Sequence, residues 1–370
     1  MSVAELIRPI PTQRVMPADK WMPPAGVRII STDDHNLESL HLWEERLPAK
    51  WQDKAPRLYR DADGALCLEA EGRSLLPKGI DENVSQGLPG YGNLEAKLAS
   101  MDAEGIEVSF LFHGIVQGLN GLQDKELYWA CMDVYNEWLI EYARPHKERL
   151  VAIAVLPTFL KPEASGEYVQ NLKAMGYKAL QMPAFPRGIR YNSREMDPLW
   201  AAIAASGIPL SFHVGAYVEF VGYGSAGANI ARNLSPYRGL LGQLMFAGVF
   251  ERHPELKVVF TEGGASWAAS AISDMDYVFQ NYYTQLNPKL GMRPSEYWHR
   301  QCYVSFITDP VAMRLVDIIG EDNMMWGSDY PHAEGTWAYS NAMMKDMWDA
   351  IGPVAGAKLL GGNAARLWNV

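Results

Sequence analysis

The chain has 370 residues, 48% of them hydrophobic, and a formal net charge of −10 at pH 7. This length suits one large α/β barrel or two ordinary domains, and the acidic balance without a dense Lys/Arg run argues against a nucleic acid partner. No segment has the length and apolarity of a membrane span or a signal peptide, and the unpaired spacing of Cys67, Cys131 and Cys302 indicates reduced thiols in a cytoplasmic protein.

The first 26 residues contain several prolines and are predicted to form an irregular N-terminal arm. Such an arm wraps the body or a neighbouring subunit, or stays free. From Val27 onward, short apolar runs alternate with longer amphipathic ones. The short runs predict eight strands, at residues 27–32, 107–112, 150–156, 178–182, 209–212, 257–261, 302–306 and 324–326.

Helical patterns separate many of these runs, at residues 93–105, 124–146, 197–207 and 235–254. Strands that alternate with helices are typical of a parallel sheet, and eight of them predict a (β/α)8 TIM barrel over residues 27–370. A doubly wound open sheet is the alternative. It is disfavoured because no glycine-rich phosphate-binding sequence follows the first strand.

The segment 51–91 interrupts this alternation. Within it, the sequence RLYRDADGALCLEAEG predicts a β-hairpin with Asp63 and Gly64 in the turn. We interpret the segment as an insertion after the first strand, on the catalytic face of the barrel.

Ionisable side chains follow several predicted strands, where the active sites of such barrels lie. Strand one ends in Asp33, Asp34 and His35, and later strands end in His113, His213, Glu262, Asp329 and His332. Asp33 and His35 are two residues apart, so both point to the same side of an extended chain. Imidazole and carboxylate donors together suit zinc, iron or manganese with an open position for water. The sequence therefore predicts a divalent metal site at these strand ends.

Each residue also has a purely structural explanation. Asp34 is interpreted as a cap of the following helix, and His113 taken alone as a core histidine bonded to a carbonyl. Glu262 would cap the next helix, and Asp329 would be a turn residue. These explanations must all hold separately, whereas one metal ion accounts for the residues together.

Several longer motifs carry a family resemblance: DDHNLESLHLWEERLP, SFHVG, ERHPELKVVFTEGGASW, WGSDYPH and GGNAARLWNV. Together they resemble the amidohydrolase superfamily, in the branch of aminocarboxymuconate-semialdehyde decarboxylase and related aromatic acid decarboxylases. The resemblance covers nearly all of residues 27–370 and implies a metal-dependent TIM barrel. By position, it implies that Asp33, His35, His213 and Asp329 are metal ligands.

Glu262 departs from the pattern of these relatives. The decarboxylases usually have a histidine with an acid–base role at this strand-six position. Dinuclear relatives have a bridging lysine or glutamate on strand four, where this chain has Gln181 and Met182. If a second ion is bound, Glu262 and Glu38 are expected to help hold it. Such a carboxylate-rich site favours iron or manganese over zinc.

These observations lead us to predict a metal-dependent hydrolase of an ester, lactone, amide or acyl thioester, acting through metal-activated water. The catalytic candidates are Asp329, which would orient or deprotonate the water, Glu262, which would ligate a second ion or shuttle a proton, and His332. The alternative is a metal-dependent non-oxidative decarboxylase of an aromatic or unsaturated acid. A third hypothesis is a metal-binding protein without catalysis.

Aromatic residues near the strand ends bear on the substrate. Trp267 follows strand six and Trp337 follows strand eight, so both are predicted to contact the substrate together with His113. The glycine-rich loop after strand five carries three more aromatic residues, Tyr217, Phe220 and Tyr223. This loop suits a lid over a bulky apolar small molecule, or a contact in the homo-oligomer that we expect.

Overall fold

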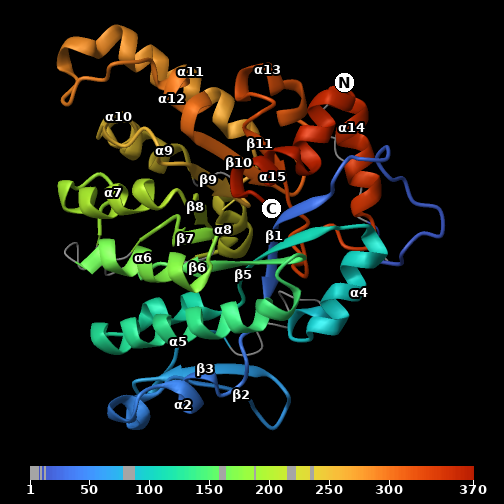
Figure 1. The fold of residues 1–370 in the computed structure, drawn as a ribbon, viewed down its shortest axis with the longest axis vertical. Coiled ribbons are helices and arrows are strands. Elements are labelled where there is room, and N and C mark those ends of the chain that lie inside the picture. The colour runs from blue at the N-terminus through green and yellow to red at the C-terminus, as the bar shows by residue number, and fades with distance from the viewer. Residues whose placement is uncertain are drawn as a thin grey trace.

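Eight parallel strands form one sheet in the order β1-β5-β6-β7-β8-β9-β10-β11, and helices surround them (Figure 1). The computed structural model describes residues 8, 11, 14–77, 88–157, 164–186, 189–214, 222–233 and 237–370. The strands are β1 (Ile30–Asn36), β5 (Val108–His113), β6 (Leu150–Val155), β7 (Ala179–Pro183), β8 (Leu210–His213), β9 (Val258–Thr261), β10 (Cys302–Phe306) and β11 (Met324–Trp326). A parallel bridge between Asp34 and Tyr330 brings the last strand back to the first. The predicted (β/α)8 TIM barrel is therefore confirmed.

The helices follow the strands in alternation. They are α2 (Leu42–Arg46), α4 (Leu94–Glu104), α5 (Lys125–Ala143), α6 (Ser165–Met175), α7 (Asp197–Ser206), α8 (Ser225–Asn233), α9 (Tyr237–Phe246), α10 (Val249–Arg252), α11 (Ser266–Tyr282), α12 (Pro294–Gln301), α13 (Val316–Ile319), α14 (Ser340–Ala357) and α15 (Asn363–Trp368). Local sequence explains several boundaries. For example, the Asn93 side chain accepts a hydrogen bond from the Ala96 amide at the start of α4, and Gly105 ends that helix with a φ of 75°.

The inside of the barrel is packed with side chains toward the N-terminal ends of the strands. Inward-facing residues there form one apolar cluster that includes Ile30, Val108, Phe110, Ile153, Val259 and Met325. Helix α15 closes this end, because Trp368 joins the cluster and its ring centroid lies 4.4 Å from that of Phe110. A functional site is therefore expected at the other end of the barrel, where the strands have their C-terminal ends.

Strand β1 differs from its predicted boundary. It runs to Asn36, through the acidic residues that were expected to end it, and all seven of its residues are buried. The pairing with β5 shifts in register between Ser31 and Asp34. Polar residues usually mark the end of a buried strand. Here the polar side chains of β1 make buried hydrogen bonds, which offset the free-energy cost of removing them from water.

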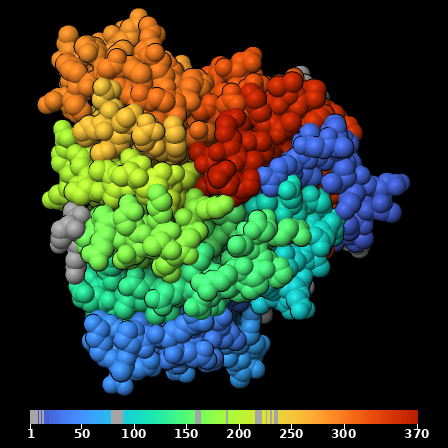
Figure 2. Space-filling model, in the orientation of Figure 1, coloured from blue at the N-terminus to red at the C-terminus, as the bar shows by residue number. Residues whose placement is uncertain are grey.

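The segment after β1 carries a small second sheet. Its antiparallel strands are β2 (Arg57–Arg60), β3 (Leu66–Ala70) and β4 (Arg73–Ser74), and the predicted hairpin turn at Asp63 and Gly64 joins the first two. The Glu71 carboxylate accepts hydrogen bonds from the amides of Gln123 and Asp124 at the start of α5. The insertion therefore packs beside the β5–α5 connection and forms one end of the molecule (Figure 2). Residues 78–87 lie outside the described residues.

The described part of the N-terminal arm, which includes residues 14–26, runs along the outer edge of the molecule beside α14 (Figure 1). Arg14 donates hydrogen bonds to the carbonyls of Ala333 and Gly335, and the ring centroids of Trp21 and Trp348 lie 5.6 Å apart. The arm thus contacts the loop that follows β11. None of the helices in the described ranges combines the length and apolarity that crossing a bilayer requires.

Two aromatic residues of the predicted lid, Tyr217 and Phe220, lie outside the described residues. Tyr223 is fully exposed.

Candidate metal centre

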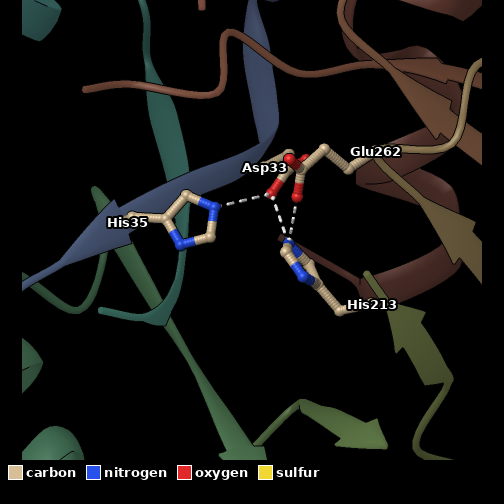
Figure 3. A group of neighbouring side chains, drawn as sticks. All are labelled: Asp33, His35, His213 and Glu262. Carbon is tan, nitrogen blue, oxygen red and sulfur yellow. Dashed lines mark hydrogen bonds and ion pairs between the residues drawn. The ribbon is translucent and has the colours of Figure 1, made fainter. Parts of the chain in front are cut away.

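Three strands, β1, β8 and β9, bring imidazoles and carboxylates together at the C-terminal end of the barrel. One ligand atom from each of Asp33, His35, His213 and Glu262 lies within 4.8 Å of the others. His213 Nε2 is 3.3 Å from Asp33 Oδ1 and 3.0 Å from Glu262 Oε2, and His35 Nε2 is 3.6 Å from Asp33 Oδ1 (Figure 3). Residues far apart in the chain therefore converge on one small volume.

A second group overlaps the first. It consists of His35, Glu262, Asp329 and His332, whose ligand atoms also lie within 4.8 Å of one another. His35 Nε2 is 3.2 Å from Asp329 Oδ1, and His332 Nδ1 is 2.8 Å from the same oxygen. The two groups share His35 and Glu262.

The backbone is strained at two of these residues. Glu262 and Asp329 both have positive φ values, 69° and 54°, although neither is glycine. Such a conformation costs about 1–3 kcal/mol and persists only where surrounding contacts enforce it. Each residue directly follows a strand or lies just beyond one, so the left-handed turn aims its carboxylate over the end of the barrel.

The unsatisfied polar atoms of the cluster fit a divalent cation. Asp33 Oδ2, His35 Nε2, Glu262 Oε2 and both carboxylate oxygens of Asp329 are buried and make no hydrogen bond with any described residue. The histidines are anchored on their other nitrogen, because His35 Nδ1 donates to the His113 carbonyl at 2.7 Å and His213 Nδ1 donates to the Val214 carbonyl at 2.9 Å. This arrangement turns Nε2 of both rings toward the carboxylates of the cluster, the orientation that metal-ligating histidines have in many metalloenzymes.

The electrostatics lead to the same conclusion. Burial, together with the charge of Asp329, raises the pKa of Glu262 well above its usual value, and burial together with the charge of Asp33 raises that of Asp329. Burial lowers the pKa of His35 well below its usual value, and the neighbouring His332 and His213 lower it further. A bound divalent cation would favour ionised carboxylates and neutral imidazoles, and so would offset these penalties.

The structure places Glu38 outside both groups. Its buried carboxylate accepts hydrogen bonds from the backbone amides of Ile115 and Val116, at 2.9 Å from each. Burial raises its pKa to about 7. Glu38 therefore braces the turn after β5 in this structure.

The predicted substrate residues have different surroundings. His113 is buried near the cluster, with its ring centroid 5.7 Å from that of His213, and its Nε2 accepts a hydrogen bond from the Gln117 amide. Trp337 is only partly buried, and its buried indole N–H has no hydrogen-bond partner among the described residues. Trp267 packs between Phe260 and other aromatic rings at the start of α11 and is 7% exposed.

Two of the structural explanations are wrong. Asp34 does not cap a helix, since its buried Oδ2 forms an ion pair with Lys97 Nζ of α4 at 2.9 Å. Glu262 does not cap α11 either, because the amides of Ala265 and Ser266 donate to the Asp309 carboxylate. Lys97, the partner of Asp34, was not predicted from the sequence. Its position three residues after Leu94 and four before Met101, on the apolar stripe of a helix, was the available signal.

The family described as Amidohydrolase matches residues 40–370, so the chain belongs to the amidohydrolase family and is an enzyme of that superfamily. It is 33% identical over 96 residues to 2-amino-3-carboxymuconate-6-semialdehyde decarboxylase from Dictyostelium discoideum, covering 25% of this chain. It is 24% identical over 193 residues to decarboxylase OrsB from Emericella nidulans, covering 47% of this chain. The chain spans 26% and 56% of the lengths of these two curated relatives.

Solved structures share the fold. One is 5-carboxyvanillate decarboxylase from Novosphingobium aromaticivorans, complexed with manganese and 4-hydroxy-3-methoxy-5-nitrobenzoic acid. It is 18% identical with a TM-score of 0.66, and the match covers 93% of this chain and 97% of that one. The predicted membership in the amidohydrolase superfamily is confirmed by the family match, and the two curated relatives are named as decarboxylases.

The predicted reaction class was wrong. The curated relatives are decarboxylases, so hydrolysis of an ester, lactone, amide or thioester is not supported. The error arose from reading the Glu262 substitution as a change of chemistry. A carboxylic acid can also donate a proton, so glutamate at this position does not by itself argue against decarboxylation.

Proposed function

We propose that this protein is a divalent-metal-dependent, non-oxidative decarboxylase of a small aromatic or unsaturated carboxylic acid. The observation that carries the proposal is the convergence of two overlapping groups, Asp33, His35, His213 and Glu262 in one and His35, Glu262, Asp329 and His332 in the other, at the open end of the barrel. Buried atoms of Asp33, His35, Glu262 and Asp329 have no hydrogen-bond partner there among the described residues. The similarity to named decarboxylases supports the reaction class.

The proposed metal ligands are Asp33, His35, His213 and Asp329. When bound, a divalent ion would supply Lewis-acid chemistry to the carboxylate and an adjacent hydroxyl of the substrate. A mixed set of two imidazoles and two carboxylates is compatible with manganese, iron or zinc, and its oxygen content favours manganese or iron. The manganese complex of the Novosphingobium decarboxylase supports manganese as the first ion to test.

Glu262 and His332 are the proposed proton-handling residues. Decarboxylation breaks the bond between the carboxyl carbon and the adjacent carbon, carbon dioxide leaves, and the electron pair left on that carbon takes a proton. Glu262 Oε2 lies 3.0 Å from His213 Nε2, and His332 Nδ1 lies 2.8 Å from Asp329 Oδ1. We propose that either residue holds a proton near the reacting carbon. A ligand role of Glu262 for a second ion is the alternative within this proposal.

The proposed substrate-binding side of the site is formed by His113 and Trp337. His113 Nδ1 is buried without a hydrogen-bond partner among the described residues, and so is the indole N–H of Trp337. Both atoms are available to a substrate hydroxyl or carboxylate. Trp267 would act indirectly, by fixing the start of α11.

We also propose a cytoplasmic location and a homo-oligomeric state. Light scattering after size-exclusion chromatography tests the oligomeric state.

A substrate panel tests the reaction class. Metal-depleted protein would be reloaded with Mn²⁺, Fe²⁺ or Zn²⁺ and given hydroxybenzoates, carboxyvanillate-like acids and unsaturated dicarboxylic acids. We expect metal-dependent release of carbon dioxide from at least one acid, and loss of that release in His213→Ala. Hydrolysis of esters or lactones included in the same panel, without carbon dioxide release from any acid, would contradict the proposal.

A further inference from the structure

The Asp34 carboxylate lies at the centre of a buried polar network behind the candidate metal centre. It is fully buried, as is Ser31 on the same strand, which donates to it at 2.9 Å. Further donors come from three other elements: Ser109 on β5, Lys97 on α4, and the Ser328–Tyr330 segment after β11. Neither candidate ligand group contains Asp34.

Two of these donors flank Asp329 in the chain. Ser328 donates its hydroxyl to Asp34 Oδ1 at 2.5 Å, and the Tyr330 amide donates to the same oxygen at 3.1 Å. The amide of Asp329 itself donates to the Asp33 carbonyl at 2.7 Å. Asp34 Oδ1 therefore accepts hydrogen bonds from both chain neighbours of Asp329. The φ of Asp329 is 54°, a conformation that persists only where surrounding contacts stabilise it.

Lys97 supplies the charge that this carboxylate needs. Its ammonium group lies 2.9 Å from Asp34 Oδ2 and 4.6 Å from the centroid of the Tyr330 ring, and the side chain is 3% exposed. A carboxylate buried beside Asp33 and Asp329 without a cation would be costly. The positive charge of Lys97 thus offsets the cost of burying the Asp34 carboxylate next to the other carboxylates of the candidate metal centre.

We infer that Asp34 and Lys97 form a positioning pair, which holds Asp329 in its left-handed conformation and so keeps its carboxylate aimed into the metal centre. The inference rests on the metal site of the proposed function. Asp34 and Lys97 are not catalytic residues, because they act through Ser328 and Tyr330. Outer partners of metal ligands typically change metal affinity or activity by about 10–100-fold when they are removed.

Two serines provide a matched test. Ser328 and Ser109 both donate a hydroxyl to Asp34, but only Ser328 is adjacent to Asp329. Ser328→Ala and Ser109→Ala each remove one such bond. A purely structural role of the network predicts similar effects, whereas the positioning role predicts a larger loss for Ser328→Ala.

The measurement is Mn²⁺ affinity of the metal-depleted full-length chain, followed by the EPR signal of free Mn²⁺ and independent of any substrate. We expect Ser328→Ala to bind Mn²⁺ about 10-fold or more weakly than wild type, and Ser109→Ala to lose at most about 3-fold. Circular dichroism and thermal unfolding without metal check that both variants are folded alike. Equal affinities for the two variants would overturn the inference.

The charge pair is tested separately. Lys97→Met leaves the Asp34 carboxylate without its cation, while Lys97→Met combined with Asp34→Asn removes both charges and keeps an oxygen that accepts from Ser328 and Tyr330. We expect the double variant to bind Mn²⁺ more tightly than Lys97→Met alone, or to fold where Lys97→Met does not. A folded Lys97→Met variant with wild-type Mn²⁺ affinity would overturn the role of the lysine. Wild-type protein that binds none of Mn²⁺, Fe²⁺ and Zn²⁺ would instead overturn the metal site of the proposed function.

Discussion

His332 stacks on His35, with ring centroids 3.9 Å apart and an angle of 27° between the planes, and both rings reach the same carboxylate oxygen of Asp329. The two histidines differ in how they are held. His35 is anchored through Nδ1 to a backbone carbonyl and is nearly fully buried, whereas the His332 side chain is 13% exposed. This difference separates a proposed ligand from a proposed proton carrier.

The histidine pair therefore gives a first prediction. His332→Ala should retain most of the bound metal and lose about 100-fold or more in kcat, because it removes a proton carrier. His35→Ala should lose most of the metal as well as the activity. Elemental analysis and kcat measured on the same samples check this. Similar metal loss in both variants would place His332 among the ligands.

Removal of the other proposed ligands should have effects specific to metal binding. His213→Ala and Asp329→Ala should each lose most bound metal while remaining folded, because their contacts are to the cluster at the open end of the barrel. Trp337→Phe is a suitable control, since its side chain is outside both ligand groups. Full metal content in either ligand variant would show that its residue has another role.

Glu262 is the residue at which this chain departs from its relatives. Glu262→Gln keeps the shape but cannot transfer a proton, so kcat should fall by about 100-fold or more. Glu262→His restores a residue type that can carry a proton and should be more active than the Gln variant. Ions per chain separate the two possible roles, because only a ligand role predicts that the Gln variant binds fewer. Near-wild-type rates in the Gln variant would refute both.

Glu38 gives a pH-dependent prediction for stability. Its pKa is raised from 4.5 to about 7 by burial, so the folded state binds a proton that the unfolded state has lost between these values. The resulting stability is fully present below about pH 4.5 and is lost as the pH rises through 7, by up to about 3 kcal/mol. Glu38→Gln does not titrate, so its thermal midpoint relative to wild type should be higher at pH 8 than at pH 5. An identical difference at both pH values would contradict the assignment.

Much of the fold follows from sequence pattern, because strands of a parallel barrel are continuous apolar runs and their helices are amphipathic. Seven of the eight strands lie within about two residues of their predicted positions, as expected for pattern-based boundaries. β1 was the exception, since a strand that buries Asp34 and His35 looks like a loop until the partners of Asp34 on α4, on β5 and after β11 are known. Lys97 and Ser328 are distant from Asp34 in sequence, and no local pattern joins them.

The proposed ligands were also accessible from sequence, because strand ends of a barrel meet at one face. The burial of Trp267 and the attachment of Glu38 to the turn after β5 were not. Both depend on how the loops between strands and helices fold. Trp267 is buried because it packs against Phe260, and Glu38 is held by hydrogen bonds from the amides of Ile115 and Val116. Adjacency to a strand end therefore indicates a candidate residue and does not determine which way its side chain points.

The most direct test of a metal-dependent decarboxylase is product analysis after reaction in D₂O, with the best acid from the substrate panel. Metal-loaded protein should release one carbon dioxide per product and place one deuterium on the carbon that lost the carboxyl group, and metal-depleted protein should form no product. Carbon dioxide release that is unchanged by metal removal, or a product formed by hydrolysis without loss of carbon dioxide, would contradict the account.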